Sequence, residues 1–183
     1  DILAVDVPAG YTTLFVFPYS VGFQFSGFKN LAALNEAITK RLKNLGVTTL
    51  LFMRHLELIE YEIKIPGKEA SGEYLLDAEP VNDHCTRVSA IESEDDKTDE
   101  SLSFIKFSMP IDSMVSTRTI DVAFTVATDK EGKTTFQKAK NPYISVYFPT
   151  ETESKLDFIV QGPFRTTPNR SSVPADEEEN EAL

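Results

Sequence analysis

Residues 120–126 read Ile-Asp-Val-Ala-Phe-Thr-Val, and this stretch decides the fold class because its larger apolar side chains occupy every second position. Residues 59–65 repeat the pattern, with Glu60, Glu62 and Lys64 between the apolar positions. A period of two is typical of a β-strand that buries one face and exposes the other. The chain is therefore expected to build a sheet with one buried and one solvated face.

Further strands are expected on both sides of these two stretches. A hairpin turn is expected at Asp129–Gly132, where a short polar segment ends in glycine. The other candidate strands are residues 12–19, 48–53, 73–78, 85–92, 101–108, 134–139, 143–149 and 156–161.

One amphipathic helix is expected near the N-terminus. Asn30 is placed to cap its start and Gly46 to mark its end. The order of strand, helix and then a long run of strands predicts an α+β fold with an antiparallel or mixed twisted sheet. Leucine and isoleucine recur at spacings of three and four, which puts these residues on one helix face: Leu31, Leu34, Ile38, Leu42 and Leu45.

The composition limits the classes of partner. The chain has 183 residues and a net charge of −11, with acidic residues concentrated in the stretches 92–100 and 176–181. Such a surface repels nucleic acid and anionic membranes, so we expect neither as a partner. Cys85 is the only cysteine, which excludes an intramolecular disulfide and favours a reducing, cytoplasmic location.

A loop rich in hydrogen-bond donors follows the last expected strand. Gly162-Pro163 ends that strand, and two arginines then follow within eight residues, among threonine, asparagine, serine and proline. A rigid loop of this composition suits the binding of an anion or a partner. The alternative is a surface loop whose polar side chains bond their own backbone. The candidate site residues are Arg165, Thr166, Thr167, Asn169 and Arg170.

Arg54 is a further candidate binding residue because it follows the apolar run 50–53, where a buried strand would reach the surface. It either pairs with a carboxylate such as Glu57 or Glu60, or faces another domain or partner. No metal site is expected, because His55 and His84 are far apart in sequence and zinc needs three or four ligands at short spacings. Cys85 lacks an activating base and is expected to be buried and structural.

Three stretches read like segments of one protein family. Residues 158–174 read FIVQGPFRTTPNRSSVP and precede acidic residues and Asn180, residues 45–63 read LGVTTLLFMRHLELIEYEI, and residues 10–19 read GYTTLFVFPY. These stretches resemble sacsin-type GHKL ATPases, relatives of the ninety-kilodalton heat-shock chaperone. The third match is the loosest, because Tyr11 is inserted after Gly10. Together the three stretches cover about a quarter of the chain.

The resemblance implies a domain organisation and a role. Residues 1–45 would be the last strand and helix of an ATPase unit, 46–166 a β-rich middle or transducer domain, and 167–183 an acidic connector. The chain would couple nucleotide state in the preceding ATPase domain to conformational change in a chaperone-like protein that acts on a client. Arg165 or Arg170 would contact the γ-phosphate or the domain interface, as a basic residue of the middle domain does in the chaperone relatives.

The motifs that hold the nucleotide in that family are not found in this sequence. It has no Asp-x-Gly-x-Gly segment for adenine and no glycine-rich phosphate loop. The chain by itself is therefore expected to bind no cofactor and to be no enzyme, whereas the full-length protein would be an ATPase using ATP and magnesium. The competing hypothesis is a passive β-rich platform that binds other proteins without contacting nucleotide. Such a platform would expose an apolar patch on its sheet.

Overall fold

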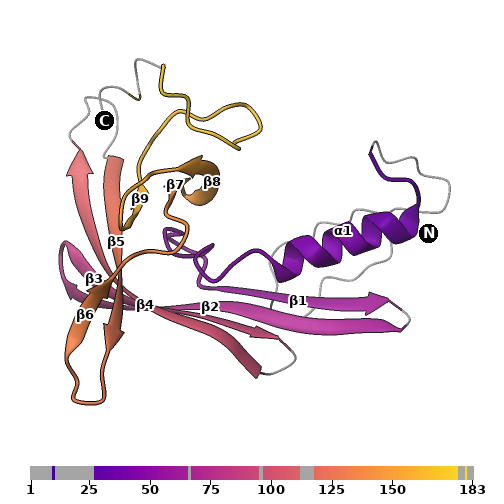
Figure 1. The fold of residues 1–183 in the computed structure, drawn as a ribbon, viewed down its shortest axis with the longest axis horizontal. Helices are drawn as coiled ribbons and strands as arrows, with labels where there is room; N and C mark the ends of the chain where they lie inside the picture. The colour runs from indigo at the N-terminus through magenta and orange to yellow at the C-terminus, as the bar shows by residue number, and fades with distance from the viewer. Residues whose placement is uncertain are drawn as a thin grey trace. The chain divides into compact units, whose positions relative to one another are not determined.

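The chain divides into two compact units, Asp1–Asn44 and Leu45–Leu183. The structure is a computed structural model that describes residues 10, 27–65, 67–94, 97–111, 118–176 and 180, with side chains except at 97–99. The helix belongs to the first unit and the strands to the second (Figure 1). The strand expected at 12–19 lies outside the described residues. No helix among the described residues has both the length and the apolarity to cross a bilayer.

Helix α1 spans Leu31–Lys43 and begins as predicted. The Oδ1 atom of Asn30 accepts a hydrogen bond of 2.9 Å from the backbone N–H of Ala33, which satisfies one of the unpaired donors of the first turn. The end of the helix differs from the prediction: Asn44 is the C-cap, so Leu45 lies outside the helix. Ile38 is 39% exposed, whereas Leu34 is buried, so the apolar stripe is only partly buried.

The second unit is built on one large sheet, which confirms the predicted α+β class with a mixed sheet. Its strand order is β1-β2-β3-β4-β5-β9-β7-β8, and β6 also pairs with β5. The pairs are antiparallel except β7 with β9, which is parallel. The strands are β1 (Leu58–Ile65), β2 (Lys68–Asn82), β3 (Cys85–Glu94), β4 (Lys97–Ile111), β5 (Arg118–Thr128), β6 (Thr134–Gln137), β7 (Tyr143–Val146), β8 (Phe148–Glu153) and β9 (Ile159–Gln161).

The hairpin between β5 and β6 forms where the sequence predicts it. The N–H of Gly132 donates to the carbonyl oxygen of Asp129 at 3.1 Å, and Gly132 has a φ of +81°. The side chain of Asp129 also accepts from the N–H groups of Glu131 and Lys133. A left-handed glycine and an aspartate that bonds the turn backbone explain why this short segment reverses the chain.

Residues 48–53 were expected to form a strand, and the structure shows that this prediction is wrong. They form successive tight turns instead, with bonds from Leu51 N to Thr48 O and from Met53 N to Leu50 O of 3.1 and 2.9 Å. The segment buries Leu50, Leu51 and Phe52 against the sheet. A short apolar run indicates burial but does not distinguish a buried strand from a buried turn.

The strand register separates the two faces of the sheet. Residues paired across antiparallel strands share a face, so the pairing of Lys106 with Ala123 and of Ile105 with Phe124 puts these two pairs on opposite faces. We call the two sides the core face and the open face. The core face packs under the 47–52 turns and carries Tyr74, Leu76, Val88, Ala90, Phe104 and Ala123.

Candidate functional site

The loop after β9 folds into a closed turn that carries Arg170. The N–H of Thr167 donates to the carbonyl of Ser172 at 3.0 Å, and the N–H of Arg170 donates to the carbonyl of Thr167 at 2.8 Å. Arg170 has a φ of +59°, in the left-handed region that residues other than glycine seldom adopt. Surrounding bonds must hold a non-glycine residue in this conformation.

Side chains brace this turn. The Oδ1 atom of Asn169 accepts from the Thr167 hydroxyl at 2.7 Å, from the Ser171 N–H at 3.2 Å and from the Ser171 hydroxyl at 3.0 Å. The N–H of Ser172 donates to the Thr167 hydroxyl at 3.2 Å. Thr167 and Asn169 thus make local bonds within the loop, as the alternative interpretation of its polar side chains predicted. Thr166 makes no hydrogen bond through its side chain within the described residues.

Two further groups of bonds tie the loop to the rest of the second unit. The N–H of Glu151, on β8, donates to the carbonyl of Ser171 at 2.6 Å, and the N–H of Val173 donates to the hydroxyl of Thr152 at 2.8 Å. The side chain of Asn180 accepts from Arg165 N at 2.7 Å and donates to Arg165 O at 3.0 Å. The turn is therefore fixed to β8 on one side and clamped at Arg165 on the other.

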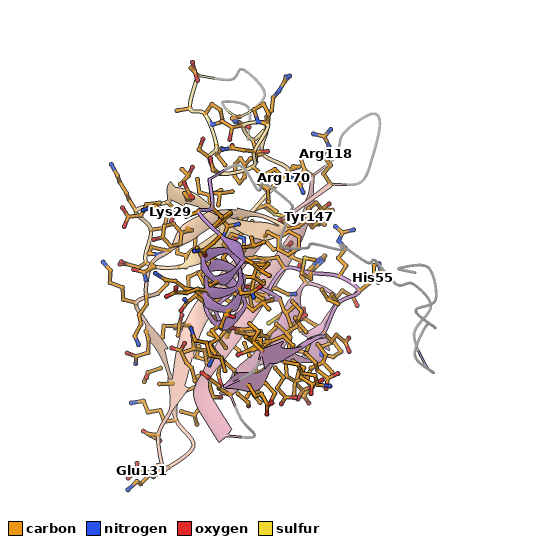
Figure 2. The ribbon with its side chains drawn as sticks, turned by 90° about the vertical axis from the view of Figure 1, so that its right-hand side faces the viewer. Lys29, His55, Arg118, Glu131, Tyr147 and Arg170 are labelled. Carbon is orange, nitrogen blue, oxygen red and sulfur yellow. The ribbon has the colours of Figure 1, made fainter. Side chains whose placement is uncertain are left out.

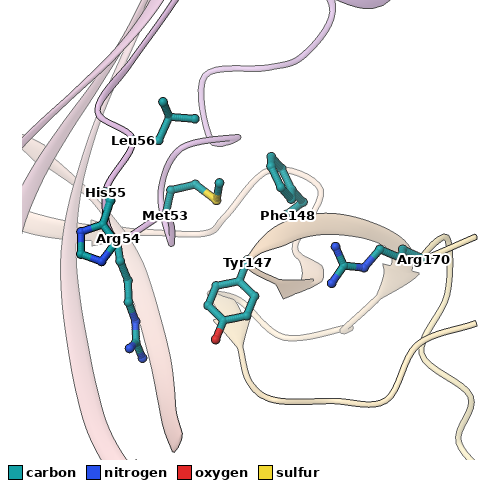
Figure 3. Close-up of a pocket in the computed structure, with 7 residues that line it drawn as sticks. All are labelled: Met53, Arg54, His55, Leu56, Tyr147, Phe148 and Arg170. Atoms are coloured by element: carbon teal, nitrogen blue, oxygen red, sulfur yellow. The ribbon is translucent and has the colours of Figure 1, made fainter. Parts of the chain in front are cut away.

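Arg170 lines a cavity of about 390 Å³ in the second unit (Figure 3). In the close-up its guanidinium points toward Tyr147 and Phe148, and Arg54 lies on the other side of Tyr147. We call this the Arg54–Arg170 cavity. The residues that line it are Met53, Arg54, His55, Leu56, Tyr147, Phe148 and Arg170.

The cavity brings together two of the predicted site residues and leaves the others outside. Arg54 and Arg170 are separated by more than a hundred residues of sequence yet line the same hollow. Neither Arg165 nor Thr166, Thr167 or Asn169 lines it. Thr167 and Asn169 shape the turn that presents Arg170, and Arg165 sits at the Asn180 clamp.

Arg54 does not form the ion pair that one reading of the sequence proposed. Its Nη2 donates to the hydroxyl of Thr119 on β5 at 2.9 Å, and it has no ion pair with Glu57 or Glu60. Arg170 likewise has no carboxylate partner within the described part of the chain. In a chain of net charge −11, two arginines without acidic partners beside one cavity are free to bind an external anion.

A third cation lies beneath the 47–52 turns. Lys106 is half-buried on the core face, and its Nζ donates to the carbonyl of Leu51 at 3.4 Å. Burial lowers the pKa of Lys106 from its ordinary value, and the charge of Asp121 opposes that shift. Lys106 therefore contributes to fixing the segment that carries Arg54.

Tyr147 and Phe148 are cavity residues that the sequence reasoning missed. A single strand was expected over 143–149, but β7 ends at Val146 and β8 begins at Phe148. Tyr147 between them has a φ of +66°, and its N–H donates at 2.8 Å to the buried side chain of Gln161. The signal in the sequence was Pro149, because proline in a strand marks an edge or an irregularity.

Three of the residues that line the cavity are labelled in Figure 2. His55, Tyr147 and Arg170 lie on one side of the second unit, whereas Glu131, at the tip of the β5–β6 hairpin, lies at the opposite end. Within the described residues no group of three or more metal-ligating side chains is close enough to hold an ion. Two arginines line this largely apolar hollow and the guanidinium of Arg170 points toward Tyr147 and Phe148, an arrangement that suits anion binding.

Cys85 differs from its expected environment. It is half-buried, not buried, and it pairs in register with Phe107 on the open face of the sheet. Its thiol is therefore partly accessible beside an aromatic side chain.

Comparison with known proteins returns no match to a family model, a curated protein or a solved structure. The resemblance to sacsin-type GHKL ATPases therefore stays a prediction from the three sequence stretches.

Proposed function

We propose that this chain is the middle, or transducer, segment of a sacsin-like GHKL ATPase and couples nucleotide state to conformational change in a chaperone-like protein. The observation that carries the proposal is the backbone conformation of Arg170 together with the absence of an ion-pair partner within the described residues. A braced turn holds its backbone in a left-handed conformation at the edge of a cavity, and no carboxylate neutralises its guanidinium within the described residues.

This state suits an arginine that acts on a phosphate bound by another domain. Guanidinium keeps its charge at every physiological pH and presents a rigid fork of donors to phosphate oxygens. The loop fixes the backbone of Arg170 in advance, so only its exposed side chain has to become ordered when the phosphate arrives, and more of the interaction can stabilise the transferred phosphoryl group. In this proposal ATP and magnesium are bound by the preceding domain, and Arg170 reaches them when the domains close.

Arg54 would assist Arg170 in this function. Its bond to Thr119 leaves most of its donors unused, and it shares the cavity with Arg170. It would either hold the facing domain or add positive charge near the phosphate.

Steady-state ATPase activity of the full-length protein tests the proposal. We expect Arg170→Ala to lower turnover tenfold or more, because an arginine that stabilises transferred phosphate contributes about 10³-fold or more. Arg165→Ala is the matched control, since Arg165 belongs to the same loop but lies outside the cavity. It should keep most of the activity. Arg170→Lys should recover only part of it, because lysine keeps the charge and loses the fork.

A second candidate function is the passive protein-binding platform with no nucleotide contact. It is favoured by exposed apolar side chains on the open face of the sheet, including Phe107, Met109 and Phe136. The same ATPase measurement separates the two. If Arg54→Ala, Arg165→Ala and Arg170→Ala all fold and keep wild-type turnover, coupling fails and the platform replaces it.

A further inference from the structure

Five apolar side chains cluster on the open face of the sheet, across β4, β5, β6 and the segment leading into β9. We call this cluster the aromatic face; it consists of Phe107, Met109, Phe124, Phe136 and Phe158. Phe124 lies at its centre, with ring centroids 6.1 Å from Phe107, 5.5 Å from Phe136 and 4.9 Å from Phe158. Tilted and edge-on contacts at these distances are favourable, so the rings stabilise one another's positions.

The aromatic face is exposed to an extent that folding alone does not explain. Phe136 is 67% exposed, Met109 64% and Phe107 41%. Scattered single apolar residues are ordinary on a protein surface, whereas a contiguous group marks a site of association. The rings are also preorganised, because Phe107, Phe136 and Phe158 each contact Phe124, and all but Phe158 project from regular strands.

The open face of the sheet carries aromatic side chains on β4, β5 and β6 and acidic side chains on β1 and β2. The register forms one transverse row, Asp77–Ser89–Ser103–Val126–Phe136, that runs over five paired strands. At 4.7–4.9 Å per strand step, Asp77 and Phe136 are roughly 19 Å apart along this row. On β1 and β2 the open face carries Glu60, Glu62, Glu69, Glu73, Asp77 and Glu79.

Few basic residues offset this acidic region. Lys64 pairs with Glu62 at 2.8 Å, and Arg87 pairs with Glu79 at 3.8 Å. No ion pair within the described residues neutralises Glu60, Glu73 or Asp77. A ligand that carries an apolar group and a positive charge roughly 19 Å apart could thus place the apolar group on the aromatic face and the charge on the acidic region.

We infer that the open face of this sheet docks an amphipathic segment of a partner protein whose apolar side chains lie on the aromatic face and whose lysine or arginine residues reach the acidic region of β1 and β2. The spacing matches about six extended residues or three to four helical turns. The net charge of −11 opposes a second copy of the chain as the occupant. This inference is independent of nucleotide coupling and of the Arg54–Arg170 cavity.

The test uses two synthetic fluorescent twelve-residue probes in a binding titration with the 183-residue chain. One probe carries leucines followed by lysines, and the other has the same leucines followed by glutamates. We expect the lysine probe to bind at least tenfold more tightly than the glutamate probe. Phe136→Ala should weaken the lysine probe at least tenfold, and Asp77→Asn should weaken it a few-fold and reduce its salt dependence.

Two controls separate docking from general attraction between opposite charges. Tyr143→Ala removes an exposed aromatic side chain of β7 that is not part of the aromatic face, and it should leave binding unchanged. Saturating lysine probe should also slow thiol labelling of Cys85, because Cys85 lies across from Phe107.

Three outcomes would overturn the inference. The first is equal affinity of wild type and Phe136→Ala for the lysine probe, which would mean that charge alone attracts it. The second is equal affinity for the two probes, which would remove the role of the acidic region. The third is self-association of the chain, measured by sedimentation, that Phe136→Ala abolishes, which would make a second copy the occupant. None of these readouts depends on ATP turnover, so failure here leaves the proposed coupling function untouched.

Discussion

Replacement of one phenylalanine on each side of the sheet tests the assignment of the core face and the open face. Phe104 on β4 is fully buried, whereas Phe136 on β6 is 67% exposed. β4 lies between two strands whereas, among the described strands, β6 pairs only with β5, so the strand preference lost on mutation to alanine can differ between them by up to about 1 kcal/mol. A difference between the two variants larger than that reports burial.

The expected magnitudes differ several-fold. Phe104 packs in the cluster that contains Leu50, Leu51 and Val88, so Phe104→Ala leaves a cavity and should lower the free energy of unfolding by about 3–5 kcal/mol. The ring of Phe136 lies against that of Phe124 at a centroid distance of 5.5 Å. Loss of such a ring contact costs about 0.5–1.5 kcal/mol, so Phe136→Ala should lower stability by about 1 kcal/mol.

Urea denaturation followed by far-ultraviolet circular dichroism measures both values. Each free energy comes from linear extrapolation, and the dependence on urea should be the same in both variants if the unfolded states are alike. Losses that are equal within about 1 kcal/mol would refute the reasoning, because the two faces would then be equally buried. A greater loss for Phe136→Ala would reverse the assignment and remove the basis for docking on the open face.

Two further predictions concern the braced turn and a buried tyrosine. Asn169→Ala removes the acceptor of three hydrogen bonds, so it should lower the melting temperature by a few degrees and speed amide hydrogen exchange at Ser171. Asn169→Asp keeps the acceptor oxygen and should restore most of the protection of Ser171 from exchange. Burial, with the charges of Glu92 and Tyr61 adding to it, raises the pKa of Tyr74 to about 12. The unfolded chain releases that proton near pH 10 and the folded chain does not, so wild-type stability should fall between pH 10 and 12. The free energy of unfolding of wild type relative to that of Tyr74→Phe, measured by urea titration, should decrease by about 1–2 kcal/mol across that range. A constant difference would contradict the burial of this hydroxyl.

Local patterns in the sequence were sufficient for much of the fold. Alternation predicted the strands of the sheet at β1 and β5, and Asp129 to Gly132 predicted the hairpin that joins β5 to β6. Asn30 predicted the start of α1. These features depend on interactions within a few residues, namely side-chain period, a capping oxygen and a left-handed glycine, so a single sequence carries them.

The bracing of the turn around Arg170 was also predictable. Thr167 and Asn169 bond groups within five residues of themselves, and such short-range bonds follow from residue type. The conformation of residues 48–53 was not predictable in this way. Their apolar character required burial, but only the sheet beneath them decided that they pack as turns and not as a strand.

The tertiary structure alone decided which distant residues meet. Arg54 and Arg170 line one cavity because β7, β8 and β9 are added beyond β5 and bring the loop after β9 toward the 47–53 turns. The transverse row from Asp77 to Phe136 likewise exists only through the registers of four strand pairs. Alternation showed that each strand has two faces, but strand order and register determine which side chains become neighbours, and these depend on contacts between segments far apart in the chain.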